Sequence, residues 1–270
     1  MTDTMNIPTE APYPGSGDSA WDRIPLGVGV SGEVAWELSQ TPNLLITGAA
    51  GSGKSVAEST IFQHLLQHKA YWKFVGIDMK GDDFKPYAKH KDVVLSITTN
   101  LDDAVSLLLA VELEIHKRTM TMQKAGVQRF TELPTPPKAM LVMIDELVGL
   151  LAPAEGDSSA TVMKQTAGSI LRVITRLGQN AGVYLVGSTQ RPDDTVLDDK
   201  LNAGFTARIA CGQMSETASQ LALDSDAAMH LPADVRGRAI IQVHGQDEEF
   251  QMYYAPPTWA DENLSYLSET

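Results

Sequence analysis

Eight residues near the middle of the first third of the chain could bind a phosphate. Gly48 to Ser55 read Gly-Ala-Ala-Gly-Ser-Gly-Lys-Ser, which fits the pattern G-x-x-x-x-G-K-[ST]. Glycines let successive backbone N–H groups turn toward a phosphate, Lys54 supplies a cation for the outer phosphates, and the Ser55 hydroxyl is a ligand for Mg²⁺. A helix after the loop aims the positive end of its dipole at the same anion. The predicted binding residues are Gly48, Ala49, Ala50, Gly51, Ser52, Gly53, Lys54, Ser55 and Val56.

An acidic pair follows an apolar run later in the chain. Ala139 to Ile144 is continuously apolar and leads directly into Asp145 and Glu146. In proteins with this kind of loop, an Asp at the end of a central strand holds Mg²⁺ through its water shell, and an adjacent carboxylate can orient and deprotonate the attacking water. We therefore expect Asp145 to serve the metal and Glu146 to be the general base. The alternative interpretation is a strand that ends in a solvated acidic turn.

A third candidate is the polar end of another apolar run. Tyr184 to Ser188 is followed by Thr189-Gln190-Arg191-Pro192. The amide of Gln190 could hydrogen-bond both a γ-phosphate oxygen and the attacking water. The alternative is a turn that Pro192 terminates.

Short apolar runs alternate with helical patterns along the chain. This alternation predicts an α/β fold, with a mostly parallel central sheet, helices on both faces and a small N-terminal β-hairpin. We expect residues 1–20, rich in Pro, Gly and small polar residues, to form a flexible arm, either disordered or loosely docked, and residues 21–270 to form one domain. The hairpin is expected within 24–38, strands at 43–47, 72–78, 139–144, 182–188, 205–211 and 238–243, and helices from 55 to about 69, 100 to about 124 and 161–177.

Composition narrows the class of protein. The 270 residues carry a net charge of −13, which argues against a monomer that coats nucleic acid. No apolar run approaches the roughly 18 residues that span a bilayer, and the N-terminus has no signal-peptide pattern, so we expect a cytoplasmic protein without direct membrane insertion.

The segment 116–130 is a local basic stretch without an acid, either a DNA-facing surface or a solvated helix end. His64 and His68 are four residues apart and are interpreted as a coincidental pair on a helix surface.

Five stretches in order make the chain resemble the FtsK/SpoIIIE family of DNA-pumping ATPases. They are PLGVGVSGEVAWEL, GAAGSGKS, VGIDMKGDDFKPY, LVMIDELVGLL, and AGVYLVGSTQRP with NAGFTARIACG. The TQRP element after AGVYL is the most specific of them. The resemblance covers roughly residues 25–245.

The resemblance implies a RecA-like P-loop ATPase that uses ATP and Mg²⁺ and assembles as a ring, with a hexamer expected. Double-stranded DNA would pass through the ring, and an arginine from the next subunit would complete each site. Arg208 is the first candidate for that arginine, with Arg176 and Arg191 as the others. The expected function is a minimal DNA translocase of a plasmid, phage or integrative element, as in conjugation, with a membrane-anchored partner left open. A protein-secretion ATPase of the type VII kind and an ATP-dependent assembly scaffold are the alternatives.

Overall fold

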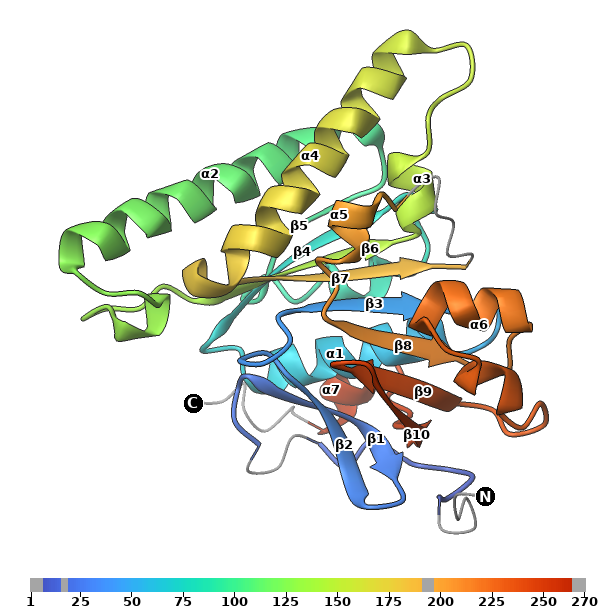
Figure 1. Cartoon of the computed structure of the whole chain (residues 1–270). Helices are drawn as coiled ribbons and strands as arrows, with labels where there is room; N and C mark the ends of the chain where they lie inside the picture. Colours follow the sequence, from blue (N-terminus) through green and yellow to red (C-terminus); the bar gives the residue numbers. More distant parts are fainter. Residues whose placement is uncertain (1–6, 16–18, 191–196, 264–270) are drawn as a thin grey trace. The chain divides into compact units, whose positions relative to one another are not determined.

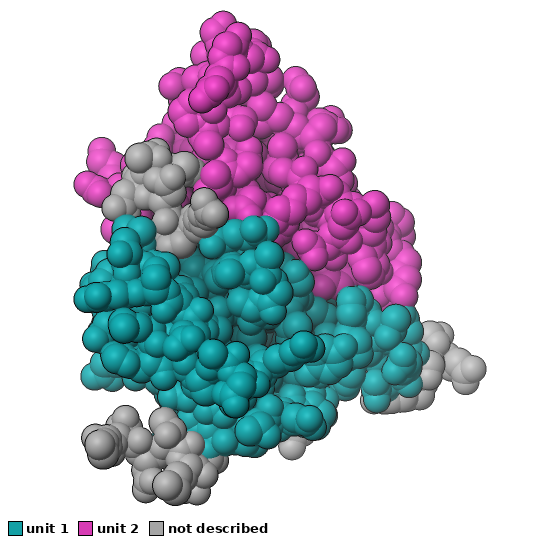
Figure 2. All heavy atoms as spheres, turned by 90° about the vertical axis from the view of Figure 1, so that its right-hand side faces the viewer, with its two compact units in different colours: residues 1–69, 188–192, 206–270 teal, residues 70–187, 193–205 magenta. Residues whose placement is uncertain are grey.

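The computed structural model describes residues 7–15, 19–190 and 197–263, and the chain divides into two compact units. Unit 1 comprises residues 1–69, 188–192 and 206–270, and unit 2 comprises residues 70–187 and 193–205 (Figure 2). The strand at residues 183–189 passes from unit 2 into unit 1.

Unit 2 is built on a parallel sheet. Its strands, in the order β7-β6-β4-β5, are β7 (Val183–Thr189), β6 (Ala139–Asp145), β4 (Trp72–Asp78) and β5 (Val94–Thr98). Every residue of β6 and β7 is buried, which explains their continuous apolar sequences. The helices α2 (Leu101–Ala125) and α4 (Ser158–Ala181) pack against each other, and both lie on the same side of these strands (Figure 1).

The two long helices of unit 2 have ends that the sequence specifies. The Asn100 side chain caps α2 by accepting a hydrogen bond from the Asp103 N–H, and Asp157 does the same for α4 at the N–H of Ala160. Both helices end at a left-handed glycine, Gly126 or Gly182. The predicted start of α2 is confirmed, and α4 extends beyond its predicted range at both ends. The short elements of unit 2 are α3 (Leu147–Leu151), α5 (Asp199–Asn202) and the 3₁₀ turns Lys85–Tyr87 and Phe130–Glu132.

Unit 1 contains a mixed group of strands. In the order β2-β1-β10-β9-β8-β3, only the β8–β3 pair is parallel. The predicted N-terminal hairpin is confirmed, and the α/β class with a parallel core holds, while β10 is an antiparallel strand that the sequence did not predict. The bounds are β1 (Arg23–Gly29), β2 (Gly32–Glu37), β3 (Asn43–Thr47), β8 (Ala207–Cys211), β9 (Arg238–Val243), β10 (Gln246–Met252), α1 (Lys54–Gln67), α6 (Glu216–Leu223), α7 (Trp259–Asn263) and a 3₁₀ turn at Ala227–His230.

Part of the segment expected to be a flexible arm is packed into unit 1. Ile7, Ala11 and Tyr13 are buried, and the Tyr13 ring contacts Trp259 edge-on with 5.0 Å between ring centroids. The Tyr13 N–H donates to the carbonyl of Tyr254 at 3.1 Å. Over residues 7–15 the segment is therefore a docked strap, and the remaining residues of the expected arm that are not described are 1–6 and 16–18.

The interpretation of His64 and His68 as a surface pair is wrong. His64 is fully buried in α1, its ring lies 4.4 Å from that of His68, and its Nε2 is 3.1 Å from the Trp21 carbonyl oxygen. Burial, together with the neighbouring His68, lowers the pKa of His64 to about 3. His64 is buried because α1 is covered on all sides over residues 57–66, including its polar residues. The spacing of apolar residues in the sequence does not reveal this burial.

We expect His64 to make the protein acid-sensitive. Its folded-state pKa lies below the unfolded value of 6.5, so its contribution to stability is complete above about pH 6.5 and is lost as the pH falls toward 3. Lowering the pH from 7 to 5 should therefore remove about 2 kcal/mol of unfolding free energy through this group. Urea unfolding at both pH values should show a smaller drop in His64→Gln than in His116→Gln, the control at an exposed site. Equal drops in the two variants would contradict the assignment.

Candidate nucleotide-binding site

The loop Gly48–Gly53 joins β3 to α1 and has the backbone of a phosphate cradle. The N–H of Gly48 donates to the Thr189 carbonyl at 3.2 Å, which ties the loop to the end of β7 within unit 1. A Cβ at Gly48 would collide with Ser52 Oγ and lie 2.8 Å from the Cys211 carbonyl oxygen, so only glycine fits there. Gly53 caps α1 in the left-handed region at φ 111°.

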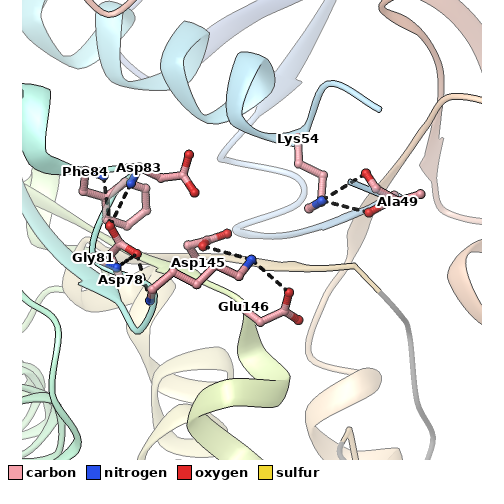
Figure 3. A network of polar contacts seen from close by, with 10 residues as sticks. Ala49, Lys54, Asp78, Gly81, Asp83, Phe84, Asp145 and Glu146 are labelled. Carbon is pink, nitrogen blue, oxygen red and sulfur yellow. Dashed lines mark hydrogen bonds and ion pairs between the residues drawn. The ribbon is translucent and has the colours of Figure 1, made fainter. Parts of the chain in front are cut away.

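Lys54 lies over this loop. It is buried, and its Nζ donates to the carbonyls of Gly48 at 2.8 Å and Ala49 at 3.3 Å (Figure 3). The first turn of α1 has no acidic residue and no side-chain cap, so the positive end of its dipole is not neutralised from within the helix. Ser52 Oγ is buried and makes no hydrogen bond within the described residues. A cation, a helix N-terminus and an unsatisfied hydroxyl at one loop fit the phosphates of a nucleotide.

The other predicted residues of the loop occupy its outer part. Ala49, Ala50 and Gly51 are exposed, and Ser55 is an exposed residue in the first turn of α1, followed by the half-buried Val56. The structure therefore brings all nine predicted loop residues together in unit 1. Their role in binding a nucleotide stays a prediction.

The acidic pair lies at the end of β6 in unit 2. Asp145 is the last residue of the strand and is buried, and Glu146 caps α3 with a left-handed backbone at φ 61° and ψ 75°. A left-handed glutamate is uncommon and costs on the order of 1 kcal/mol. This turn ends β6 at Asp145 and starts α3 after Glu146, so the two carboxylates lie next to each other between the strand and the helix.

Lys80, to which the sequence pattern assigned no role, contacts both carboxylates. Lys80 Nζ lies 3.2 Å from Glu146 Oε2 and 3.6 Å from Asp145 Oδ2 (Figure 3). Burial lowers the pKa of the Lys80 ammonium, but the two carboxylates outweigh this effect and the pKa is raised above its ordinary value. Lys80 is therefore charged at neutral pH and offsets part of the negative charge of the pair.

The loop that carries Lys80 is organised by Asp78, the last residue of β4. One carboxylate oxygen accepts from the N–H groups of Lys80 at 3.2 Å and Gly81 at 2.7 Å, and the other accepts from Asp83 at 2.9 Å and Phe84 at 3.1 Å. Asp78 is buried and is paired in the sheet with Asp145. The sequence held one signal for this loop: Asp78 at the end of a strand is followed by Gly81 and two more acids. Asp side chains accept hydrogen bonds from nearby backbone N–H groups and so stabilise turns.

Replacing Asp78 should destabilise the protein markedly. In Asp78→Asn, an amide NH₂ replaces an acceptor oxygen and leaves two backbone N–H groups without an acceptor, which should lower the unfolding free energy by about 2 to 4 kcal/mol. Urea unfolding measures this change. The matched control is Asp82→Asn, whose side chain is 84% exposed and pairs with Lys85. Equal stabilities of the two variants would show that the four hydrogen bonds do not hold the loop.

Comparisons with known proteins show the family to which the chain belongs. Residues 16–134 match the model of the FtsK/SpoIIIE family. The chain is 34% identical over 229 residues to the DNA translocase FtsK of Chlorobaculum tepidum, covering 77% of this chain and 27% of that protein. This chain carries an ATPase domain of the FtsK/SpoIIIE family. The FtsK of Streptococcus pneumoniae is 30% identical over 231 residues, and the chain spans about a quarter of the length of these curated FtsK relatives.

Solved structures show the same RecA-like fold. The conjugation coupling protein TcpA of pCW3, in a monomer form with ATPγS, superposes with a TM-score of 0.88 at 25% identity, over 98% of this chain and 74% of that one. The cytoplasmic domain of the type VII secretion ATPase EccC of Thermomonospora curvata has a TM-score of 0.70 at 23% identity, over 86% of this chain and 28% of that one. The expected fold is therefore confirmed, and a structural relative of this FtsK/SpoIIIE domain binds an ATP analogue.

The remaining predicted residues of this FtsK/SpoIIIE domain are Gln190 and the candidate arginines. Gln190 is half-buried and directly follows Thr189, whose carbonyl accepts from the N–H of Gly48. Arg208 is buried in β8, and its guanidinium donates to the Ala222 carbonyl at 3.2 Å. An arginine that completes another subunit's site would have to leave this contact. Arg176 is exposed on α4, and Arg191 lies outside the described residues.

The basic stretch 116–130 separates into two kinds of residue. Arg118 is buried, pairs with Glu114 at 2.8 Å and donates to the Ala181 carbonyl at 2.9 Å, so it holds α2 in place. Lys117, Lys124 and Arg129 are exposed. Among the described residues, no helix is both long and apolar enough to cross a bilayer.

Proposed function

We propose that this domain hydrolyses ATP with the help of Mg²⁺ and uses the energy to move double-stranded DNA. The observation that carries the proposal is the 34% identity, over most of the chain, to a protein named DNA translocase. The likeness to a conjugation coupling protein supports a role in DNA transfer by a plasmid, phage or integrative element. Such work would take place in the cytoplasm, with any membrane attachment supplied by a partner.

The loop residues would bind the triphosphate. The backbone N–H groups around Gly51 and Gly53 and the N-terminus of α1 would face the phosphates, and Lys54 would turn from the carbonyls of Gly48 and Ala49 to the outer phosphate oxygens. Ser55 and Asp145 are the residues that would hold Mg²⁺. The ion, when bound, would neutralise charge that develops on the phosphates during transfer. Mg²⁺ commonly takes only one or two carboxylates from a protein, and Asp145 provides one.

Three further side chains are assigned to the hydrolytic step. Glu146 would accept the proton of the attacking water, since it is the carboxylate next to the metal residue. Gln190 would hydrogen-bond the γ-phosphate and the same water. Arg208 remains our candidate for the arginine supplied between subunits, with Arg176 as the exposed alternative.

The translocation step requires DNA to contact a net acidic chain. We propose a ring of identical subunits, with a hexamer expected, in which the exposed bases of α2 and the turn after it face the duplex. Those bases are Lys117, Lys124 and Arg129. Contacts of this kind track phosphates without reading bases, and their strength falls with salt.

Steady-state ATP hydrolysis with and without linear double-stranded DNA tests the proposal. We expect a several-fold stimulation by duplex DNA at 50 mM salt that weakens at 200 mM, because released counterions drive the association. Single-stranded DNA of equal length is the matched control and should stimulate less. A rate of ATP hydrolysis that does not change with DNA would contradict the proposed translocase and favour a secretion ATPase. Nucleotide-dependent assembly without ATP turnover would favour a scaffold.

A further inference from the structure

Lys80 has no role in the proposed reaction, yet it contacts both members of the acidic pair. Its Nζ lies 3.2 Å from Glu146 Oε2 and 3.6 Å from Asp145 Oδ2, all within unit 2 (Figure 3). The Asp145 side chain is only 3% exposed and that of Glu146 15%, whereas Lys80 is 40% exposed. The lysine therefore approaches two shielded carboxylates from the solvent side.

The backbone of the loop fixes the position of Lys80 beside the two carboxylates. The N–H of Lys80 is one of the four that the Asp78 carboxylate binds, so the loop places the Lys80 Cα at a defined point beside β6. The far end of the loop is anchored by Phe84, which is fully buried and stacks on Tyr87. Gly81 adopts φ 85°, which lets the chain turn directly after Lys80.

We propose that Lys80 is a positioning residue that competes with the metal for the acidic pair, an inference that rests on the proposed function. A second cation bound to the oxygens of Asp145 and Glu146 would be repelled by the Lys80 ammonium at these distances, and the repulsion would grow as the two approached. If Asp145 held a divalent ion, the Lys80 ammonium would therefore be pushed away from the pair. The cost of that displacement weakens metal binding, and the exposed position of Lys80 gives its ammonium a route to solvent.

The same displacement controls the general base. While Lys80 donates to Glu146 Oε2 at 3.2 Å, the ammonium occupies the position from which that oxygen would accept a proton from water. When the ammonium leaves, Oε2 becomes available. Lys80 would thus link the binding of the metal to the release of Glu146.

The test is a Mg²⁺ titration of the binding of a fluorescent, non-hydrolysable ATP analogue, followed by anisotropy on the full chain. Lys80→Met should lower the Mg²⁺ concentration at half-saturation by about threefold, a size typical of a partly exposed ion pair. Lys80→Arg should keep the wild-type midpoint, because it preserves the charge. Lys85→Met, which removes an exposed lysine of the same loop region, is the matched control and should also keep it.

The outcomes separate this inference from the proposed function. If the wild type binds the analogue without any dependence on Mg²⁺, the assignment of Ser55 and Asp145 to the metal fails and the inference fails with it, whereas the proposed translocation is decided by the DNA dependence of hydrolysis. If the wild type depends on Mg²⁺ but the midpoint of Lys80→Met is unchanged or higher, only the role of Lys80 is wrong. Thermal unfolding checks the fold, and Lys80→Gln replaces Lys80→Met if the latter does not fold.

Discussion

Replacing Glu146 with glutamine should reduce steady-state ATP hydrolysis by about 1000-fold while ATP binding is retained. The amide has the size of the carboxylate and keeps a hydrogen-bonding oxygen, but it cannot accept the proton of the attacking water. The left-handed backbone of Glu146 and its place at the start of α3 are equally open to glutamine. Rapid-quench measurement of a single turnover isolates the chemical step from product release, and filter binding of labelled ATP should show the nucleotide trapped on the variant.

The matched control is Glu155→Gln. Glu155 is an exposed glutamate in the segment between α3 and α4, and its replacement removes the same charge from the same unit. We expect hydrolysis within about twofold of wild type, because surface charges far from a site contribute little. Turnover of Glu146→Gln at the rate of this control would show that another group activates the water.

Replacing Lys54 with alanine should weaken ATP binding by about 100-fold or more, as expected for the loss of a charge-assisted contact to a phosphate. Lys54 is buried over the loop and points at the carbonyls of Gly48 and Ala49, so it is close to where the outer phosphates would lie. The measurement is anisotropy of a fluorescent ATP analogue at saturating Mg²⁺.

Two controls accompany the Lys54 variant. Lys69→Ala removes an exposed lysine just beyond the end of α1 and should bind ATP as the wild type does. Urea unfolding of Lys54→Ala shows whether the loop still folds once the ammonium is lost. A folded Lys54→Ala that binds with wild-type affinity would remove the loop from the nucleotide site.

Elements whose signals are local were predictable from the sequence. The strands β3 and β4 have their predicted ends because apolar runs of five to seven residues stop at polar or glycine-rich turns. The start of α2 was predictable because Asn100 and the acids after it match the chemistry of a helix N-terminus.

Elements stabilised by partners far along the chain were missed. β10 begins Gln-Asp-Glu-Glu, a sequence poor in β-formers, and is a strand because β1 and β9 flank it. Its hairpin with β9 turns through His244 and Gly245, both with positive φ, where the sequence has histidine in place of the usual Asn or Asp. β5 is as short as β3 but was missed because it is partly exposed and its apolar residues are interrupted by Ser96, whereas β3 is wholly buried.

The candidate site shows the same division. The loop at Gly48–Ser55 was found because all its functional groups lie within eight residues. The ion pair between Lys80 and Glu146 joins residues 66 apart in the chain, and the contact of Arg118 with the Ala181 carbonyl spans 63. No pattern in a single sequence marks such pairs, so Arg118 was grouped with the other bases of residues 116–130, and Lys80 was given no role although it lies in the stretch VGIDMKGDDFKPY.

If ATP hydrolysis moves this domain along duplex DNA, as we propose, displacement of a third strand measures that movement directly. A fluorescent triplex-forming strand is placed at one end of a linear duplex, and its release is followed after ATP is added. We expect release by the wild type that is delayed as the duplex leading to the triplex is lengthened, and no release by Glu146→Gln. A wild type that hydrolyses ATP in the presence of DNA yet never displaces the strand, or that displaces it without ATP, would contradict the account.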